Sequence, residues 1–98
     1  MNSTNKEEGF FDAVEIPIDG FLDLHMFAPK DATSVVDEYI TECLEAGIHE
    51  VKIVHGKGKG ILRRTVHSFL KRHPKVMSYS LDGGSSSWGA TIAHLKDD

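Results

Sequence analysis

The chain has 98 residues, of which 40% are hydrophobic and 27% charged, a length and composition typical of one globular domain. No apolar run reaches the roughly 18 residues that a membrane-spanning helix needs, and the first residues lack the basic and then apolar layout of a secretory signal. The single cysteine, Cys43, excludes an internal disulfide and a multi-cysteine zinc site. We therefore expect one domain in the reducing cytoplasm, with no membrane partner.

The net charge of −4 does not represent the charge of each part of the chain. Residues 1–50 hold 12 acids against two lysines, whereas residues 51–80 hold eight lysines and arginines and no acid. Residues 81–98 hold three acids and one lysine. A basic segment of this size can attract a polyanion to one face of an acidic protein. The alternative interpretation is a basic helix that is solvated on its outer face.

Strands and helices are predicted to alternate along the chain. Residues 1–19 are expected to form a polar tail and an extended arm, and residues 20–98 the domain. The predicted elements are a strand over 21–25, a helix over 32–44, a strand over 51–54, a helix over 61–73, and strands over 76–81 and 90–95. The order β-α-β-α-β-β predicts an α/β two-layer sandwich. It consists of a four-stranded mixed sheet packed with two helices, and its last two strands form an antiparallel edge hairpin.

Apolar stripes at helical spacing predict the two helices. The first stripe consists of Ala32, Val35, Val36, Tyr39, Ile40, Cys43 and Leu44, and Gly47 supplies the C-terminal stop. The second stripe consists of Leu62, Val66, Phe69 and Leu70. His73 ends the second helix because it precedes a proline, and such a residue avoids the helical conformation.

Asp23 and His25 stand two residues apart at the end of the first predicted strand, and therefore on one face of it. A carboxylate within hydrogen-bond distance of an imidazole fixes its tautomer and raises its basicity, as a general base requires. The two residues are candidate catalytic residues. The alternative is a polar pair that only forms hydrogen bonds with nearby backbone.

A glycine-rich run, HGKGKG, occupies residues 55–60 between a predicted strand and a predicted helix. Glycines let backbone amides turn toward a bound anion, and a helix N-terminus adds favourable potential. Arg63 and Arg64 follow in the first helical turn, where they oppose the helix dipole, so an external phosphate explains them better than helix stability does. The spacing is neither that of a P-loop nor that of a dinucleotide-binding motif. Binding of a phosphate backbone is therefore assigned to Gly56, Lys57, Gly58, Lys59, Gly60, Arg63 and Arg64, with a bare glycine turn as the alternative.

His55 begins this loop and is a candidate acid or base for a reaction at the phosphate. A third loop, residues 83–89, offers amides, hydroxyls and the indole of Trp88, which could stack on a base or anchor the hairpin in the core. No set of residues has metal-ligand spacing, so no zinc site is expected. The other histidines are assigned no catalytic role. His67 and His73 are expected to be solvated cations or spacers on the second helix, and His49 and His94 are expected to be structural.

Together these motifs resemble the small MutS-related domain, or Smr domain, over about residues 18–95. The run Leu22-Asp23-Leu24-His25 resembles the LDLH motif of that family, and residues 55–58 resemble its HGxG motif. Leu62-Arg63 and Gly89-Ala90-Thr91 also match, in the same order. One departure is Met26, followed by Phe27, where the family usually has glycine. A side chain there could narrow the approach of a strand or offer a stacking surface.

The resemblance implies an α/β sandwich like the C-terminal domain of bacterial translation initiation factor 3. It also implies nucleic-acid binding and, in many members, endonuclease activity on DNA or RNA. The roles of the two motifs carry over to Asp23, His25, His55, Gly56 and Gly58. No MutS-like ATPase region is present in these residues, so we expect a stand-alone member of the bacterial type.

The leading hypothesis is an endonuclease of RNA or structured DNA in which Asp23, His25 and His55 are catalytic, the two histidines sharing the acid and base roles. RNA cleavage needs no cofactor because its 2′-hydroxyl is the nucleophile, whereas DNA cleavage would use a divalent ion, Mg²⁺ or Mn²⁺, at Asp23. The alternative is a non-catalytic module that binds nucleic acid or a ribonucleoprotein, with the ribosome and the repair machinery as possible partners. An enzyme of small phosphates is a third hypothesis, and a monomer is the default state.

Overall fold

The computed structural model describes residues 16–84 and 89–97. The described part contains six main elements: β1 (Phe21–Asp23), α2 (Ala32–Glu45), β2 (Glu50–Val54), α3 (Ile61–Arg72), β3 (Val76–Leu81) and β4 (Ala90–Leu95). Two single-turn 3-10 helices connect β1 to α2: η2 (Leu24–Met26) and η3 (Pro29–Asp31). The predicted order β-α-β-α-β-β is confirmed. The expectations for residues 1–15 and for Trp88 lie outside the described residues.

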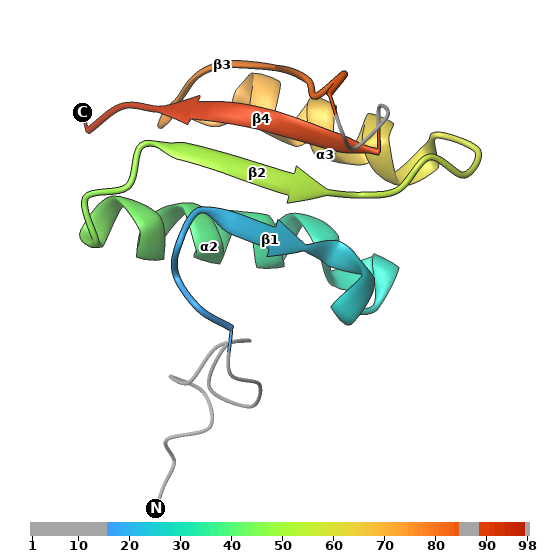
Figure 1. Ribbon diagram of the computed structural model, residues 1–98, viewed down its shortest axis with the longest axis horizontal. Coiled ribbons are helices and arrows are strands. Elements are labelled where there is room, and N and C mark those ends of the chain that lie inside the picture. The colour runs from blue at the N-terminus through green and yellow to red at the C-terminus, as the bar shows by residue number, and fades with distance from the viewer. Residues whose placement is uncertain (1–15, 85–88, 98) are drawn as a thin grey trace, which may run out of the picture.

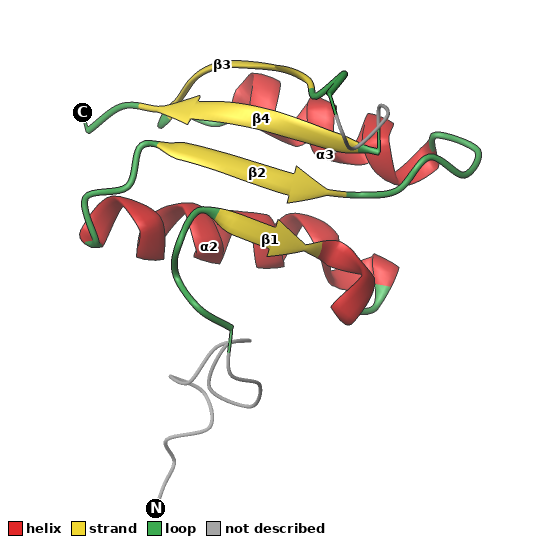
Figure 2. Ribbon diagram, in the orientation of Figure 1, coloured by secondary structure: helices red, strands yellow, loops and turns green. Residues whose placement is uncertain are grey.

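The four strands form one mixed sheet in the order β1-β2-β4-β3. β1 and β2 are parallel, and β4 is antiparallel to both β2 and β3. The last two strands therefore form the predicted hairpin. Of these two, β3 lies at an edge of the sheet, whereas β4 lies inside it, between β2 and β3. Both helices lie on the same side of the sheet, and its other face is open (Figures 1 and 2). The two-layer sandwich is thus confirmed.

The core lies between this sheet and the helices. The apolar stripe of α2 is buried as predicted except for Leu44, which is partly buried, and Val66 and Leu70 of α3 belong to the same buried cluster. Leu62 and Phe69 are partly buried at the rim of the same core. Burial of these stripes, at about 25 cal/mol per Å² of apolar area, supplies the main driving force for the fold.

The phenol of Tyr39 fixes the chain where it enters β1. Its hydroxyl is buried and accepts hydrogen bonds from the amides of Gly20 and Phe21, each at 3.1 Å. The same oxygen lies 3.1 Å from the carbonyl of Pro17, to which it can donate. Ile16 and Ile18 pack against the core beside it. Burial raises the pKa of Tyr39 from 10.0 to about 12, so the phenol stays a neutral donor.

β1 is two residues shorter than predicted, because the carboxylate of Asp23 caps the turn that follows. Its Oδ1 accepts a hydrogen bond from the amide of His25 at 2.9 Å, and the chain then enters η2. Leu24 remains buried as the alternating pattern required. The prediction that Leu24 and His25 continue the strand is therefore wrong, although the pattern of burial is right.

Candidate functional site

Asp23 and His25 form a side-chain pair at the end of β1. Nδ1 of His25 donates to Oδ1 of Asp23 over 2.9 Å, because an ionised carboxylate can only accept. The imidazole is 60% exposed and the carboxylate 37% exposed. The neutral ring therefore carries its lone pair on Nε2, on the side away from Asp23. This is the geometry of an exposed general base with an orienting carboxylate.

The free nitrogen of His25 faces the glycine-rich loop. A Cβ placed on Gly56 would lie 2.9 Å from Nε2 of His25, closer than real Cβ atoms approach other atoms. Gly56 also has a φ of +82°, which side chains rarely adopt. Glycine is thus required at this position twice over, by its backbone conformation and by the contact with His25. The two predicted motifs meet at this contact.

His55 is brought to the same site, but its position differs from that of His25. It is only 4% exposed, and both of its ring nitrogens are hydrogen-bonded. Nδ1 donates to the carbonyl of Gly56 at 2.9 Å, and Nε2 lies 2.8 Å from Oγ1 of Thr91. Burial lowers the pKa of His55, so the ring is neutral and Nε2 accepts from the hydroxyl. The structure thus places His55 beneath the loop rather than on its surface.

Thr91 joins His55 to a third histidine. Oγ1 of Thr91 lies 2.6 Å from Nε2 of His67, which donates to it since the hydroxyl proton goes to His55. Burial also lowers the pKa of His67, and its ring packs on Tyr79 with 4.9 Å between ring centroids. The expectation that His67 is solvated is therefore wrong. The sequence does not indicate that His67 is partly buried and hydrogen-bonded, because its partner, Thr91, lies on a strand 24 residues further along the chain.

The loop and the start of α3 gather positive charge around Gly60. A Cβ on Gly60 would meet the guanidinium of Arg63 at 2.8 Å and that of Arg64 at 3.2 Å, so both side chains fold back over the helix N-terminus. Among residues 16–84 and 89–97, no carboxylate pairs with either arginine. The two guanidinium groups repel each other, and the positive end of the helix dipole repels both of them. A bound anion would relieve that repulsion.

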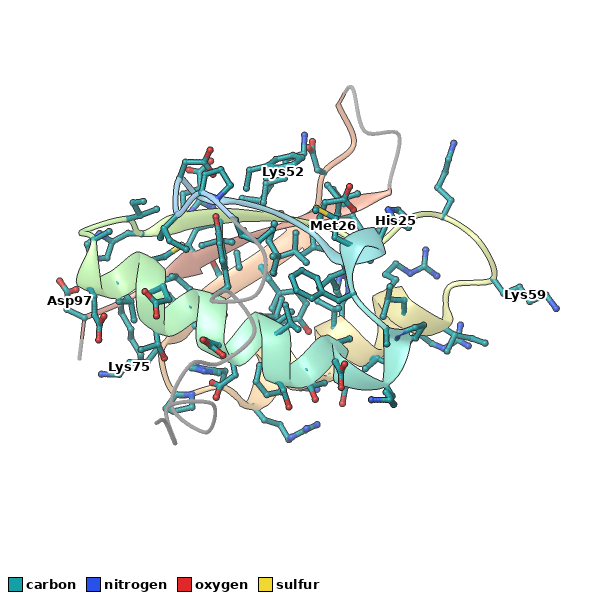
Figure 3. The ribbon with its side chains drawn as sticks, turned by 90° about the horizontal axis from the view of Figure 1, so that it is seen from below. His25, Met26, Lys52, Lys59, Lys75 and Asp97 are labelled. Carbon is teal, nitrogen blue, oxygen red and sulfur yellow. The ribbon has the colours of Figure 1, made fainter. Side chains whose placement is uncertain are left out.

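The loop encloses a hollow of about 280 Å³ lined by residues 55–63. Lys57 and Lys59 are exposed at its rim, and Lys59 lies at the tip of the loop, at the same end of the molecule as His25 (Figure 3). The third predicted loop also takes part, because the carbonyl of Gly89 accepts hydrogen bonds from the amides of His55 and Gly56. The loops after β1 and β2 and the start of β4 therefore meet at one end of the sheet.

The remaining predicted residues lie outside this site. His73 is not solvated as expected: its side chain is 9% exposed, and its Nε2 lies 2.8 Å from Asp37 of α2. The two histidines expected to be structural each lie near a surface carboxylate, His49 near Asp97 and His94 near Glu50. In the described part of the chain, no three histidine, cysteine or acidic side chains come together as a metal site. No described helix is long and apolar enough to cross a membrane.

The fold and the site define a class of protein: a small α/β domain with a glycine-rich, basic loop and an exposed, carboxylate-oriented imidazole at one end of the sheet. Comparison with known families gives the particular assignment. A family model described as the Smr domain matches residues 22–96. The chain belongs to the Smr domain family.

Several relatives of this chain are much longer proteins. It is 43% identical over 76 residues to the endonuclease MutS2 of Brevibacillus brevis, a match covering 76% of this chain and 10% of that protein. It is 42% identical over 82 residues to the endonuclease MutS2 of Caldicellulosiruptor bescii, covering 82% of this chain and again 10% of the relative. The chain thus spans about a tenth of the length of these relatives.

Two solved structures share the fold. The Smr domain of Thermus thermophilus MutS2 has a TM-score of 0.72 and 28% sequence identity, covering 78% of this chain and 96% of that one. YdaL, a stand-alone small MutS-related protein from Escherichia coli, has a TM-score of 0.70 and 23% identity. That match covers 98% of this chain and 77% of YdaL, and at this identity it supports the fold alone.

Proposed function

We propose that this Smr domain is a nucleic-acid-binding endonuclease that cleaves phosphodiester bonds at the edge where β1 and β2 end. The observation that carries the proposal is that the side chain of His25 is 60% exposed while its Nε2 lies so close to the loop that a Cβ on Gly56 would be only 2.9 Å from it, in a loop suited to hold a phosphate. The endonucleases among the relatives support the same reaction class.

In the proposed reaction, the amides and cations of residues 56–60 hold the scissile phosphate, and Arg63 and Arg64 offset the charge that develops on it. His25 moves the proton at the substrate because its side chain is exposed and its Nε2 carries the lone pair, and Asp23 holds its tautomer. His55 is buried with both nitrogens engaged, so we assign it the role of holding the Gly56 carbonyl rather than that of an acid or base.

RNA is the substrate that this residue set suits best. Its 2′-hydroxyl gives up a proton to His25 and attacks the adjacent phosphorus, and the bond to the 5′-oxygen then breaks, that oxygen taking its proton from water. The products are a 2′,3′-cyclic phosphate and a 5′-hydroxyl. DNA would require water as the nucleophile and a divalent ion, Mg²⁺ or Mn²⁺. Asp23 would then be its ligand, through the oxygen that does not bind His25.

A cleavage assay tests this proposal. End-labelled single-stranded RNA and supercoiled plasmid would be incubated with wild type, His25→Ala and Asp23→Asn, each with and without a chelator. We expect wild type to cleave RNA in the presence of the chelator. His25→Ala should bind the substrate and lose at least about a hundredfold in rate, the usual contribution of general acid–base catalysis.

His94→Ala is the matched control, because His94 is a half-exposed histidine paired with a carboxylate on the same sheet. It should cleave like wild type. Intact substrates with wild type, together with salt-dependent binding, would instead make this domain a non-catalytic nucleic-acid module. Loss of all cleavage on chelation would replace RNA transesterification by the metal-dependent reaction.

A further inference from the structure

The surface charges of the domain favour one path for a polyanion that leaves the phosphate loop. From residue 61 to residue 75 the chain carries five basic residues and no acid. The neighbouring α2 and its entry turn carry the opposite charge, with five acids against one lysine: Asp31, Asp37, Glu38, Glu42 and Glu45 against Lys30. A strand held at residues 55–60 is therefore repelled by α2 and attracted along α3.

The open sheet face offers no comparable attraction. Its side chains include Asp23 and Glu50, and its lysine, Lys52, is paired at 3.0 Å with the carboxylate of Asp82. Lys52 projects from this face, on the opposite side of the sheet from the helices (Figure 3). The charges on this face do not compete with the basic side of α3 for a phosphate backbone.

The basic residues of α3 are Arg63 and Arg64 at its start and Lys71 and Arg72 at its end. A cleft lies beside the end of this helix, between α3 and β3. Its volume is about 340 Å³, within the range of small-ligand sites, and it is lined by Leu70, Lys71, Val76, Met77, Ser78 and Tyr79. Met77 is 64% exposed, at a shift of strand register between Val76 and Ser78. An exposed thioether beside an exposed lysine offers both an apolar, polarizable surface and a positive charge.

The distance from the loop to this cleft suits one nucleic-acid strand. Lys71 lies ten residues after Ile61, which is about 15 Å along the axis of α3. At about 3.4 Å per nucleotide in a stacked strand, this spans about four nucleotides, and fewer if the strand is extended. A base within that reach can enter the cleft only if it is unpaired, since a paired base presents only its edges.

We propose that the α3–β3 cleft binds an unpaired base of the same strand whose phosphate lies in the 55–60 loop. The base lies on Met77, and Lys71 contacts the adjoining phosphate. The inference rests on the proposed function and defines its substrate further: a single-stranded segment extending a few nucleotides to one side of the scissile phosphate.

A binding assay with abasic oligonucleotides tests the cleft. The assay measures binding of single-stranded oligonucleotides to His25→Ala, in which cleavage is strongly slowed. Each oligonucleotide lacks one base, at one of positions one to five on either side of the central phosphate. We expect one position, on one side, at which loss of the base weakens binding about tenfold, the size of a typical stacking contribution. In His25→Ala/Met77→Ala that dependence should vanish, and Lys71→Ala should weaken binding to all oligonucleotides alike.

Phe21→Ala and Lys30→Ala are the matched controls, because Phe21 is half-exposed on the open sheet face and Lys30 is exposed beside the acidic helix. Both should bind like the parent. An abasic effect that persists without the Met77 side chain, or no position-dependent effect at all, would refute the inference. Cleavage by wild type in that case would leave the proposed function standing. Base-dependent binding without any cleavage would refute the endonuclease and keep the cleft.

Discussion

The substitution Gly56→Ala should reduce cleavage without a comparable effect on folding. The new methyl group would lie 2.9 Å from Nε2 and 3.3 Å from Cε1 of His25. Ordinary contact begins at 3.4 Å, so one of the two groups must move by about half an ångström or more. The imidazole moves more readily than the loop backbone because its side chain is 60% exposed.

A second glycine separates this displacement from backbone strain. Gly47 has a φ of +80°, almost the same as the +82° of Gly56, but a Cβ there would meet nothing within 4 Å. Alanine at either position should therefore cost a similar 1–2 kcal/mol, roughly the penalty of the left-handed conformation. Displacement of a catalytic group by about 1 Å can cost about a hundredfold in rate. We expect Gly56→Ala to lose ten- to a hundredfold in cleavage and Gly47→Ala to lose none.

The two variants would be compared by urea denaturation, followed by circular dichroism, and by single-turnover cleavage of the best substrate. Equal losses of stability with unequal losses of rate are the expected result. Cleavage by Gly56→Ala at the wild-type rate would show that the position of His25 against the loop does not matter for the reaction. A Gly56→Ala protein much less stable than Gly47→Ala would show that the loop, rather than the imidazole, had yielded.

Three further predictions concern stability. Thr91→Val should lower the free energy of unfolding by about 2–4 kcal/mol, because it leaves one buried and one partly buried imidazole nitrogen without their partner. Thr41→Val, at an exposed hydroxyl, should change it little in the same urea titrations. Burial lowers the pKa of His55 and of His67 below 6.5, so the unfolded chain takes up their protons at a higher pH than the folded protein does. Stability should fall as the pH drops from 7 to 5, by up to about 1.4 kcal/mol per pH unit for each histidine, and less steeply in His67→Gln. The pKa of Tyr39 is raised to about 12, so its contribution to the stability of the wild type is complete below pH 10 and is lost between pH 10 and 12. Tyr39→Phe should be less stable than the wild type at pH 8 and should not show this alkaline loss of stability.

The elements of the fold could be predicted because each has a local signal. Helices α2 and α3 follow stripes of apolar residues at helical spacing, and every residue of both stripes is buried or partly buried in the core. The strands alternate with these helices and therefore join a common sheet. The end of β1 could not be predicted in this way. An aspartate inside an alternating pattern does not show that its carboxylate will cap the next turn.

The exposed part of the site was accessible to sequence reasoning, whereas its buried support was not. Asp23, His25 and the loop were found because their spacing is local and their chemistry is familiar. The network of His55, Thr91 and His67 joins residues up to 36 positions apart, and its geometry follows from β4 lying beside β2. Gly89-Ala90-Thr91 matches a motif of the family, but nothing in the sequence indicates that the hydroxyl of Thr91 bridges two imidazoles.

The central position of β4 has a consequence for the order in which the candidate site is assembled. The last strand in chain order is also the one that pairs with two others, and the carbonyl just before it receives the amides of His55 and Gly56. Until residues 89–95 have left the ribosome, the amides of His55 and Gly56 lack the carbonyl that accepts their hydrogen bonds. In the same interval no strand joins β2 to β3. Synthesis from the N-terminus therefore delays assembly of this edge of the sheet until the last strand of the domain has emerged.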